Sequence, residues 1–394
     1  MYYADYLQLD KVLGAQQPLS KVGADNTPAH EEMLFIVTHQ TYELWFKQVL
    51  HEVSSVIDVF ERPPVSDNMM GVIANRLERV VEILKVLVQQ FTILETMYPT
   101  AFLEFRDALV PASGFQSRQF RVLENRLGLR TDLRLEYART VYKDFFHHDD
   151  RLALEQSERQ ASLFDVVERW LERTPFLEHA NFAWWDAYRT AVMTEMARQR
   201  REIETNPFFD AKDRDANLAA LTVTEKSFQT LFDEKAYAEV VLQNRVSRNF
   251  SYRAMQAALL ISLYKDEPIF QMPHKLLTLL VDIDAQLANW RYRHAAMVQR
   301  MIGVKIGTGG SSGYHYLRTT QTDRYKVFVD LYHMSTYLLP RSALPTLPSG
   351  LLREMHFFGS EARAPAHANA APSSSAFRQA VMATVSQTLV DDRD

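Results

Sequence analysis

Apolar residues recur at three- and four-residue spacing along most of this chain, whereas the alternation of apolar and polar residues that marks a strand is hard to find. The pattern predicts an all-α protein. The segments with the clearest helical spacing are residues 28–60, 69–97, 102–109, 252–268 and 272–303. Because the second of these is densely apolar, we expect it to lie in the middle of a helical bundle.

The rest of the chain has a different composition. Residues from about 151 to 243 are more charged and less apolar, which indicates peripheral helices, with a small helical subdomain at about 176–244. Residues 361–394 begin with a stretch rich in alanine, proline and serine. This stretch predicts a linker and a C-terminal tail.

The composition excludes several kinds of chemistry. The net charge of -5 and the pI of about 6.2 imply no general attraction to nucleic acid or to an anionic membrane. The N-terminal sequence lacks the features of a signal peptide and no apolar run is long enough to span a membrane, so we expect a cytoplasmic protein. The chain has no cysteine, so any metal must be held by His, Asp, Glu or Tyr.

Two histidines lie on largely apolar helix faces. His294 projects from a nearly apolar stripe, in which the neighbours at helical spacing include Ile283, Leu287, Trp290, Val298 and Met301. It is either a core histidine bonded to a carbonyl group or an axial haem ligand. His39 lies among Phe35, Tyr42 and Phe46 at helical spacing, and it either packs in the core or faces a flat aromatic ligand as a donor or a base.

Two further segments could contact a ligand. Arg106 follows an apolar turn of helix and precedes the Ser113-Gly114 turn, so it makes an internal ion pair or clamps a carboxylate. Five of the 12 glycines fall within residues 303–313, "GVKIGTGGSSG". This sequence is neither a Walker loop nor a dinucleotide fingerprint. It is either disordered or a hydroxyl-rich loop that closes over a ligand.

Several long blocks resemble the tryptophan 2,3-dioxygenase family, among them "HEEMLFIVTHQTYELWFKQVLHE", "FRDALVPASGFQSRQFRVLEN", "SYRAMQAALL" and "WRYRHAAMVQRMIGVKIGTGGSSGYHYLRTT". The resemblance covers residues from about 3 to about 345. It implies an all-α, haem-containing helical bundle that assembles as a homotetramer, a dimer of dimers. It also implies a ferrous haem b and an enzyme that cleaves the indole C2-C3 bond of L-tryptophan with O2. The product would be N-formyl-L-kynurenine, in the first step of the kynurenine pathway.

The resemblance also implies roles for individual residues. His294 would be the proximal ligand of the haem iron, and His39 the catalytic distal histidine that bonds the indole N–H. The substrate-binding residues would be Phe35, Arg106, Thr308, Tyr3, Tyr6 and Leu7, and the haem pocket would include Ser113 and Gly114. Tyr3, Tyr6 and Leu7 belong to an N-terminal arm, residues 1–15, that would reach a neighbouring subunit. Residues 16–360 would form the haem dioxygenase domain.

Other functions remain compatible with these residues. The nearest is a haem oxygenase of the same scaffold that acts on a substituted indole or a tryptophan derivative. A haem protein that senses or stores gas is a second alternative, but it would have no use for an amino-acid clamp at Arg106 and Thr308. A purely structural helical scaffold is the third, and it would bind no haem.

Overall fold

The computed structural model describes residues 1–62, 65, 67–134, 143, 146–174, 177–179, 182–243, 249–305 and 313–355. The chain divides into two compact units, residues 1–348 and 349–394. In the second unit the described part is helix α16, Ser349–Met355. The tail expected at residues 361–394 lies outside the described residues.

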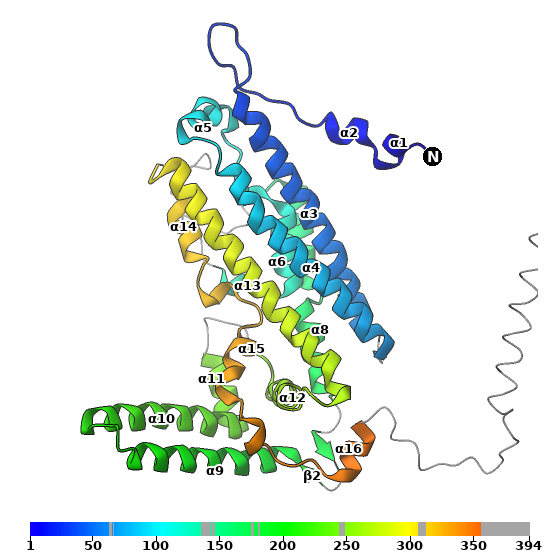
Figure 1. Cartoon of the computed structure of the whole chain (residues 1–394). Coiled ribbons are helices and arrows are strands. Elements are labelled where there is room, and N and C mark those ends of the chain that lie inside the picture. The colour runs from blue at the N-terminus through cyan, green and yellow to red at the C-terminus, as the bar shows by residue number, and fades with distance from the viewer. Residues whose placement is uncertain are drawn as a thin grey trace, which may run out of the picture. The chain divides into compact units, whose positions relative to one another are not determined.

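The first unit is built from helices (Figure 1). Its α-helices are α1 Tyr3–Leu7, α2 Leu9–Leu13, α3 His30–Phe60, α4 Asp67–Leu94, α5 Pro99–Phe105, α6 Arg118–Leu127, α7 His148–Arg159, α8 Leu163–Glu172, α9 Trp184–Thr205, α10 Ala211–Phe232, α11 Glu234–Gln243, α12 Tyr252–Leu263, α13 Pro268–Ile302, α14 Gly313–Thr319 and α15 Val329–His333. Its 3-10 helices are η1 Arg106–Leu109, η2 Gly114–Gln116, η3 Thr131–Leu133, η5 Asp323–Tyr325, η6 Met334–Tyr337 and η7 Arg341–Ala343.

The prediction of an all-α fold is confirmed. Among the described residues, extended pairing is confined to the two-residue strands β1, Glu178–His179, and β2, Phe182–Ala183, and to one isolated bridge between Val22 and Thr27. The strands are antiparallel, with Glu178 opposite Ala183.

The longest helices form the core. Helix α4 packs against both α3 and α13, and the three run side by side in Figure 1. The helical spacing of apolar residues explains this position, because α4 buries a stripe that includes Ile73, Leu77, Leu84 and Phe91. The prediction that this helix lies in the middle of the bundle is confirmed.

Several helix boundaries differ from the prediction, among them the end of α12 at Leu263, expected at residue 268, and the end of α4 at Leu94, expected at residue 97. Helix α13 begins at Pro268, before the expected start at residue 272, because a proline in the first turn gives up no hydrogen bond. It ends, as expected, before Gly303, whose φ of 61° and ψ of -128° suit glycine. The short helix predicted at 102–109 is divided: α5 begins at Pro99 and ends at Phe105, and the tighter η1 begins at Arg106.

Buried carboxylates fix the segment that follows α14. Asp284 on α13 accepts hydrogen bonds from the backbone N–H groups of Val327, at 3.1 Å, and Phe328, at 2.6 Å. Asp330 accepts from the backbone N–H of Phe250 at 2.6 Å. Burial raises the pKa of Asp284 to about 6, although the two N–H groups act in the opposite direction. These bonds hold the chain beyond α14 against α13 and against the start of α12.

Candidate active site

A cavity of about 210 Å³ lies within the first unit. Its walls come from α3, α5 with η1, the turn around Ser113, α6, α13 and α14. Six residues with a predicted site role line it together: Phe35, His39, Arg106, Ser113, Gly114 and His294. Gly313 of the glycine cluster also lines it. They come from positions as far apart as 35 and 294, so the fold assembles the site.

Three of the remaining predicted residues do not line this cavity. Tyr3, Tyr6 and Leu7 lie on α1, and their side chains are exposed. Thr308 lies outside the described residues, as do Gly307, Gly309 and Gly310 of the glycine cluster.

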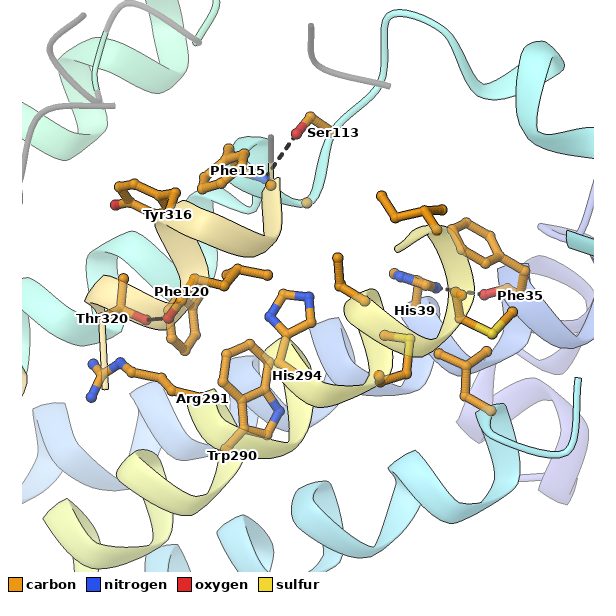
Figure 2. A pocket seen from close by; sticks show the side chains of 18 of the residues that line it. Phe35, His39, Ser113, Phe115, Phe120, Trp290, Arg291, His294, Tyr316 and Thr320 are labelled. Carbon is orange, nitrogen blue, oxygen red and sulfur yellow. Dashed lines mark hydrogen bonds between the residues drawn. The ribbon is translucent and has the colours of Figure 1, made fainter. Parts of the chain in front are cut away.

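His294 lies on α13, and its ring points into the cavity (Figure 2). The ring packs against Trp290, with centroids 5.1 Å apart, and against Phe91, at 6.1 Å. Its Nδ1 is buried and has no hydrogen-bond partner among the described residues. Burial, together with the charges of His39 and Arg121, lowers the pKa of His294 to about 4. The imidazole is therefore neutral at pH 7, the form that can bind a metal.

His39 lies on α3, and its ring packs on Phe35 at a centroid distance of 4.0 Å. Its Nδ1 is 2.7 Å from the backbone oxygen of Phe35. Because a carbonyl oxygen has no proton, Nδ1 must donate this bond, which leaves the lone pair on Nε2. Burial lowers the pKa of His39, and the Phe35 carbonyl and Glu43 offset this effect in part. By surface area the residue is nevertheless exposed, and it lines the cavity.

Further aromatic rings pack against Phe35 on this wall. Phe35 is 5.9 Å from Phe102 and 5.6 Å from Phe105 between ring centroids, and the last two rings meet edge to face. Arg106 follows directly in the chain and lines the same cavity. The grouping suits a ligand with an aromatic ring and a negatively charged end.

The other two rings on the predicted face of α3 have a different role. Tyr42 and Phe46 are buried and pack against Trp290, at centroid distances of 6.2 and 6.1 Å. They belong to the core that supports His294, and they do not line the cavity.

Side-chain hydrogen bonds hold the segment that follows the Ser113 turn against α3. The Ser113 hydroxyl accepts the backbone N–H of Phe115 at 3.4 Å, drawn as a dashed line in Figure 2. Three residues further along the chain from Gly114, Ser117 donates to the carboxylate of Glu43 at 2.6 Å, and Gln119 donates to the same carboxylate at 2.8 Å. Glu43 lies one helical turn after His39, so this carboxylate connects the histidine's helix to the turn that borders the cavity.

A buried charge cluster at the cavity wall was not predicted from the sequence. Arg121 donates to Glu124 at 2.9 Å and Arg291 donates to Glu124 at 3.1 Å, and both arginines line the cavity with Glu124. Arg134 is 3.6 Å from the same carboxylate. The spacing of Arg121 and Glu124 on α6 could have suggested an ion pair, but it does not reveal that the pair is buried or that Arg291 joins it.

The structure is a helical bundle with a cavity that is lined by aromatic rings and by two neutral histidines, one from α3 and one from α13. The chain belongs to the tryptophan 2,3-dioxygenase family, because the sequence model of that family, described as Tryptophan 2,3-dioxygenase, matches residues 1–338.

Curated relatives agree with this assignment. Tryptophan 2,3-dioxygenase of Dictyostelium discoideum is 50% identical over 358 residues, which cover 91% of this chain and 88% of the relative. The enzyme of the same name from Bdellovibrio bacteriovorus is 45% identical over 91% of this chain and 98% of its own. That of Mus musculus is 47% identical, and the match covers 88% and 84% of the two chains.

Within the described residues, no helix has the length and apolar character needed to cross a membrane. The same part of the chain contains no group of three or more His, Asp or Glu side chains arranged to hold a metal ion.

Proposed function

We propose that this protein is a haem-dependent dioxygenase that cleaves the indole C2-C3 bond of L-tryptophan with O2 and yields N-formyl-L-kynurenine. The observation that carries the proposal is the meeting of His294, His39, Phe35 and Arg106 in one cavity. Membership of the family supports the same reaction. In this role the protein would catalyse the first step of the kynurenine pathway.

The residues present fit haem b. His294 would bind the iron, because its imidazole is neutral, points into the cavity and has large apolar neighbours. Ser113 and Gly114 would border the porphyrin. Haem, when bound, supplies the activation of dioxygen that protein side chains alone cannot provide.

The opposite wall fits the substrate. Arg106 would bind the carboxylate of tryptophan through its two-pronged guanidinium, and Phe35 would pack on the indole ring. Two fixed ends would hold the indole in one orientation, which lowers the entropic part of the barrier. Thr308, outside the described residues, is proposed to contact the ammonium and carboxylate groups.

His39 would orient the indole by accepting its N–H. The Phe35 carbonyl holds the proton on Nδ1, so Nε2 is the nitrogen left to accept. The lowered pKa of His39 makes it a weaker base, which favours positioning over removal of the indole proton.

The N-terminal arm is proposed to complete the site of a neighbouring subunit within a homotetramer. The side chains of Tyr3 and Tyr6 are each 71% exposed, and exposed apolar groups close together are typical of a protein–protein interaction site. The chain is anchored to α3 just after the arm, where the carboxylate of Glu32 accepts the backbone N–H groups of Leu19, at 2.7 Å, and Ser20, at 2.9 Å. At the end of the arm, Gln40 donates to the backbone oxygen of Ala15 at 3.0 Å, so residues 1–14 precede these anchors.

The deciding experiment is a single turnover of ferrous, haem-loaded protein with L-tryptophan and isotopically labelled dioxygen. We expect a ring-opened product that contains two labelled oxygens. One labelled oxygen would indicate a monooxygenase acting on an indole. No product from haem-loaded protein would indicate a gas-binding function instead.

A further inference from the structure

Glu43 is a carboxylate on the same face of α3 as His39. It follows His39 by four residues, a spacing that places the two Cβ atoms about 6 Å apart. Its two oxygens accept hydrogen bonds from the Ser117 hydroxyl, at 2.6 Å, and from the Gln119 amide, at 2.8 Å. Gln119 also donates to the backbone oxygen of Glu43 at 2.8 Å. Because both donors belong to the start of α6, a second helix holds the carboxylate in one place.

The donors to Glu43 carry no charge. Among the described residues, no arginine or lysine forms an ion pair with this carboxylate. Glu124, at the cavity wall, differs in this respect: burial raises its pKa, but three arginines outweigh burial and lower the pKa to about 2. The charge of Glu124 is thus balanced by cations, whereas the charge of Glu43 is left to act on its surroundings.

The charge of Glu43 reaches His39. Burial lowers the pKa of His39, whereas the Phe35 carbonyl and the charge of Glu43 raise it. Nδ1 of His39 donates to the Phe35 carbonyl, the dashed line beside the ring in Figure 2, so the lone pair lies on Nε2. When Nε2 accepts a hydrogen bond, electron density is drawn from the ring, and a nearby negative charge favours this change.

We propose that Glu43 is a positioning residue that acts through His39 and strengthens its Nε2 as the acceptor of the indole N–H, an inference that rests on the proposed function. Arg106 would bind the substrate carboxylate whether or not the indole nitrogen carries a hydrogen. The preference for a free N–H therefore depends on His39, and Glu43 sets the size of this preference. A substrate methylated on the indole nitrogen has no N–H to donate and gains nothing from Glu43.

The test compares the binding of L-tryptophan and of 1-methyl-L-tryptophan to the full, ferric, haem-loaded chain, by titration followed by absorbance. In Glu43→Gln the side chain keeps its size and can still accept from Ser117, but its charge is lost. We expect this variant to bind tryptophan about threefold to tenfold more weakly than the native chain does, as weakening of one hydrogen bond predicts. Its affinity for 1-methyl-L-tryptophan should be unchanged, so the preference falls by the same factor.

A second variant removes the effect of the charge by another route. Gln119→Lys keeps a donor beside Glu43 and balances the carboxylate with an ammonium group. The preference for tryptophan should fall by a factor similar to that of Glu43→Gln. Since Glu43 itself is intact in this variant, the result does not depend on whether Glu43→Gln folds.

Two further variants serve as controls. Glu43→Asp keeps the charge on a shorter side chain and should retain most of the preference. Glu52→Gln removes another carboxylate of α3, one that ties this helix to α4 through Arg79 at 2.8 Å. Glu52 is about 20 Å from His39 along the helix axis. This variant should leave the preference unchanged, whatever its effect on stability.

Two results would overturn the role of Glu43 while the proposed function stands. One is equal weakening of both ligands by Glu43→Gln and Gln119→Lys, which would mean that Glu43 only supports the fold. The other is full retention of the native preference by these variants. If the native chain binds both ligands equally, His39 does not accept the indole N–H and the role of Glu43 fails with it. If the native chain binds neither ligand, the proposed function itself fails.

Discussion

The two walls of the cavity are built in different ways. The wall that carries His294 consists of the long helix α13 and of α6, with rings packed behind it and ion pairs whose side chains are at most 9% exposed. The wall that carries His39 and Arg106 consists of the first turns of α3, the seven-residue α5, a 3-10 helix and a turn. Its side chains are more accessible, with Phe35 and Arg106 only partly buried.

This difference matches the two tasks of the site. A cofactor that stays bound is best held by a wall with little freedom to move, since each ligand must keep its geometry. A substrate that enters and leaves at every turnover needs a wall of short elements that can adjust. Substitutions on the His294 wall should therefore affect cofactor binding and stability, and those on the His39 wall should affect substrate affinity and turnover.

The largest effect is expected from His294→Ala. Loss of the proposed iron ligand should reduce haem affinity more than about 100-fold, since even changes to groups that only orient a ligand cost up to that much. Haem titration followed by absorbance measures this. His315→Ala, an exposed histidine on α14, is the matched control. Retention of haem at native affinity by the His294 variant would assign the iron to another residue.

Glu124→Gln should follow, as a loss of stability. The pKa of Glu124 is about 2 in the folded protein and 4.5 without its surroundings, so its stabilisation is present above about pH 4.5 and disappears as the pH falls toward 2. The shift corresponds to about 3 kcal/mol. Urea unfolding at pH 7 and pH 4 should show that the variant has a lower free energy of unfolding than the native chain. This free energy should also change less with pH in the variant.

The exposed pair of Arg118 and Asp150 offers the comparison for that measurement. Asp150→Asn should cost less than about 1 kcal/mol, because water already screens the pair. If Glu124→Gln and Asp150→Asn lower the free energy of unfolding equally, the buried cluster stabilises the His294 wall no more than an exposed ion pair would.

On the other wall, Arg106→Leu should weaken tryptophan binding by about 10- to 100-fold and leave the haem spectrum unchanged. The tryptophan affinity of Arg106→Lys should lie between those of Arg106→Leu and the native chain, because an ammonium group keeps the charge but not the two-pronged geometry of the guanidinium. Equilibrium titration of the ferric protein with tryptophan provides the measurement. A variant that loses haem instead would place Arg106 on the cofactor side of the site.

On the same wall, a smaller effect should come from His39→Ala, which should reduce the preference for a substrate with a free indole N–H by about tenfold. The native chain should bind tryptophan more tightly than 1-methyltryptophan, and the variant should lose this preference. If tryptophan binding is normal but turnover is abolished, His39 acts as a base and the positioning role is wrong.

Local sequence patterns predicted much of the fold and the chemical centre of the site. Apolar spacing located α3, α4, α12 and α13, because each buries a stripe at helical period. His294, His39 and Arg106 could be selected because each places a polar group on an apolar face. The resemblance to a family then supplied their proposed roles.

Long-range partners could not be predicted in this way. Arg291 and Glu124 are 167 residues apart in the chain, and Glu43 and Ser117 are 74 apart. Each of these side chains looks like an ordinary surface residue in the sequence, since spacing along one helix says nothing about what another helix brings to it. The division of residues 99–109 into α5 and η1 also escaped prediction, because both conformations suit the same apolar pattern.

The bond between Glu43 and Ser117 has a consequence for how such a site can diversify. Hydrogen bonds from Ser117 and Gln119 to Glu43 hold the segment after the Ser113 turn against α3, and these three side chains do not line the cavity. Exchanges at Phe35 or Phe102 can therefore reshape the space offered to a ring while the scaffold keeps its dimensions. Natural or laboratory selection can therefore change the side chains that line the cavity without changing the hydrogen bonds that hold its walls together.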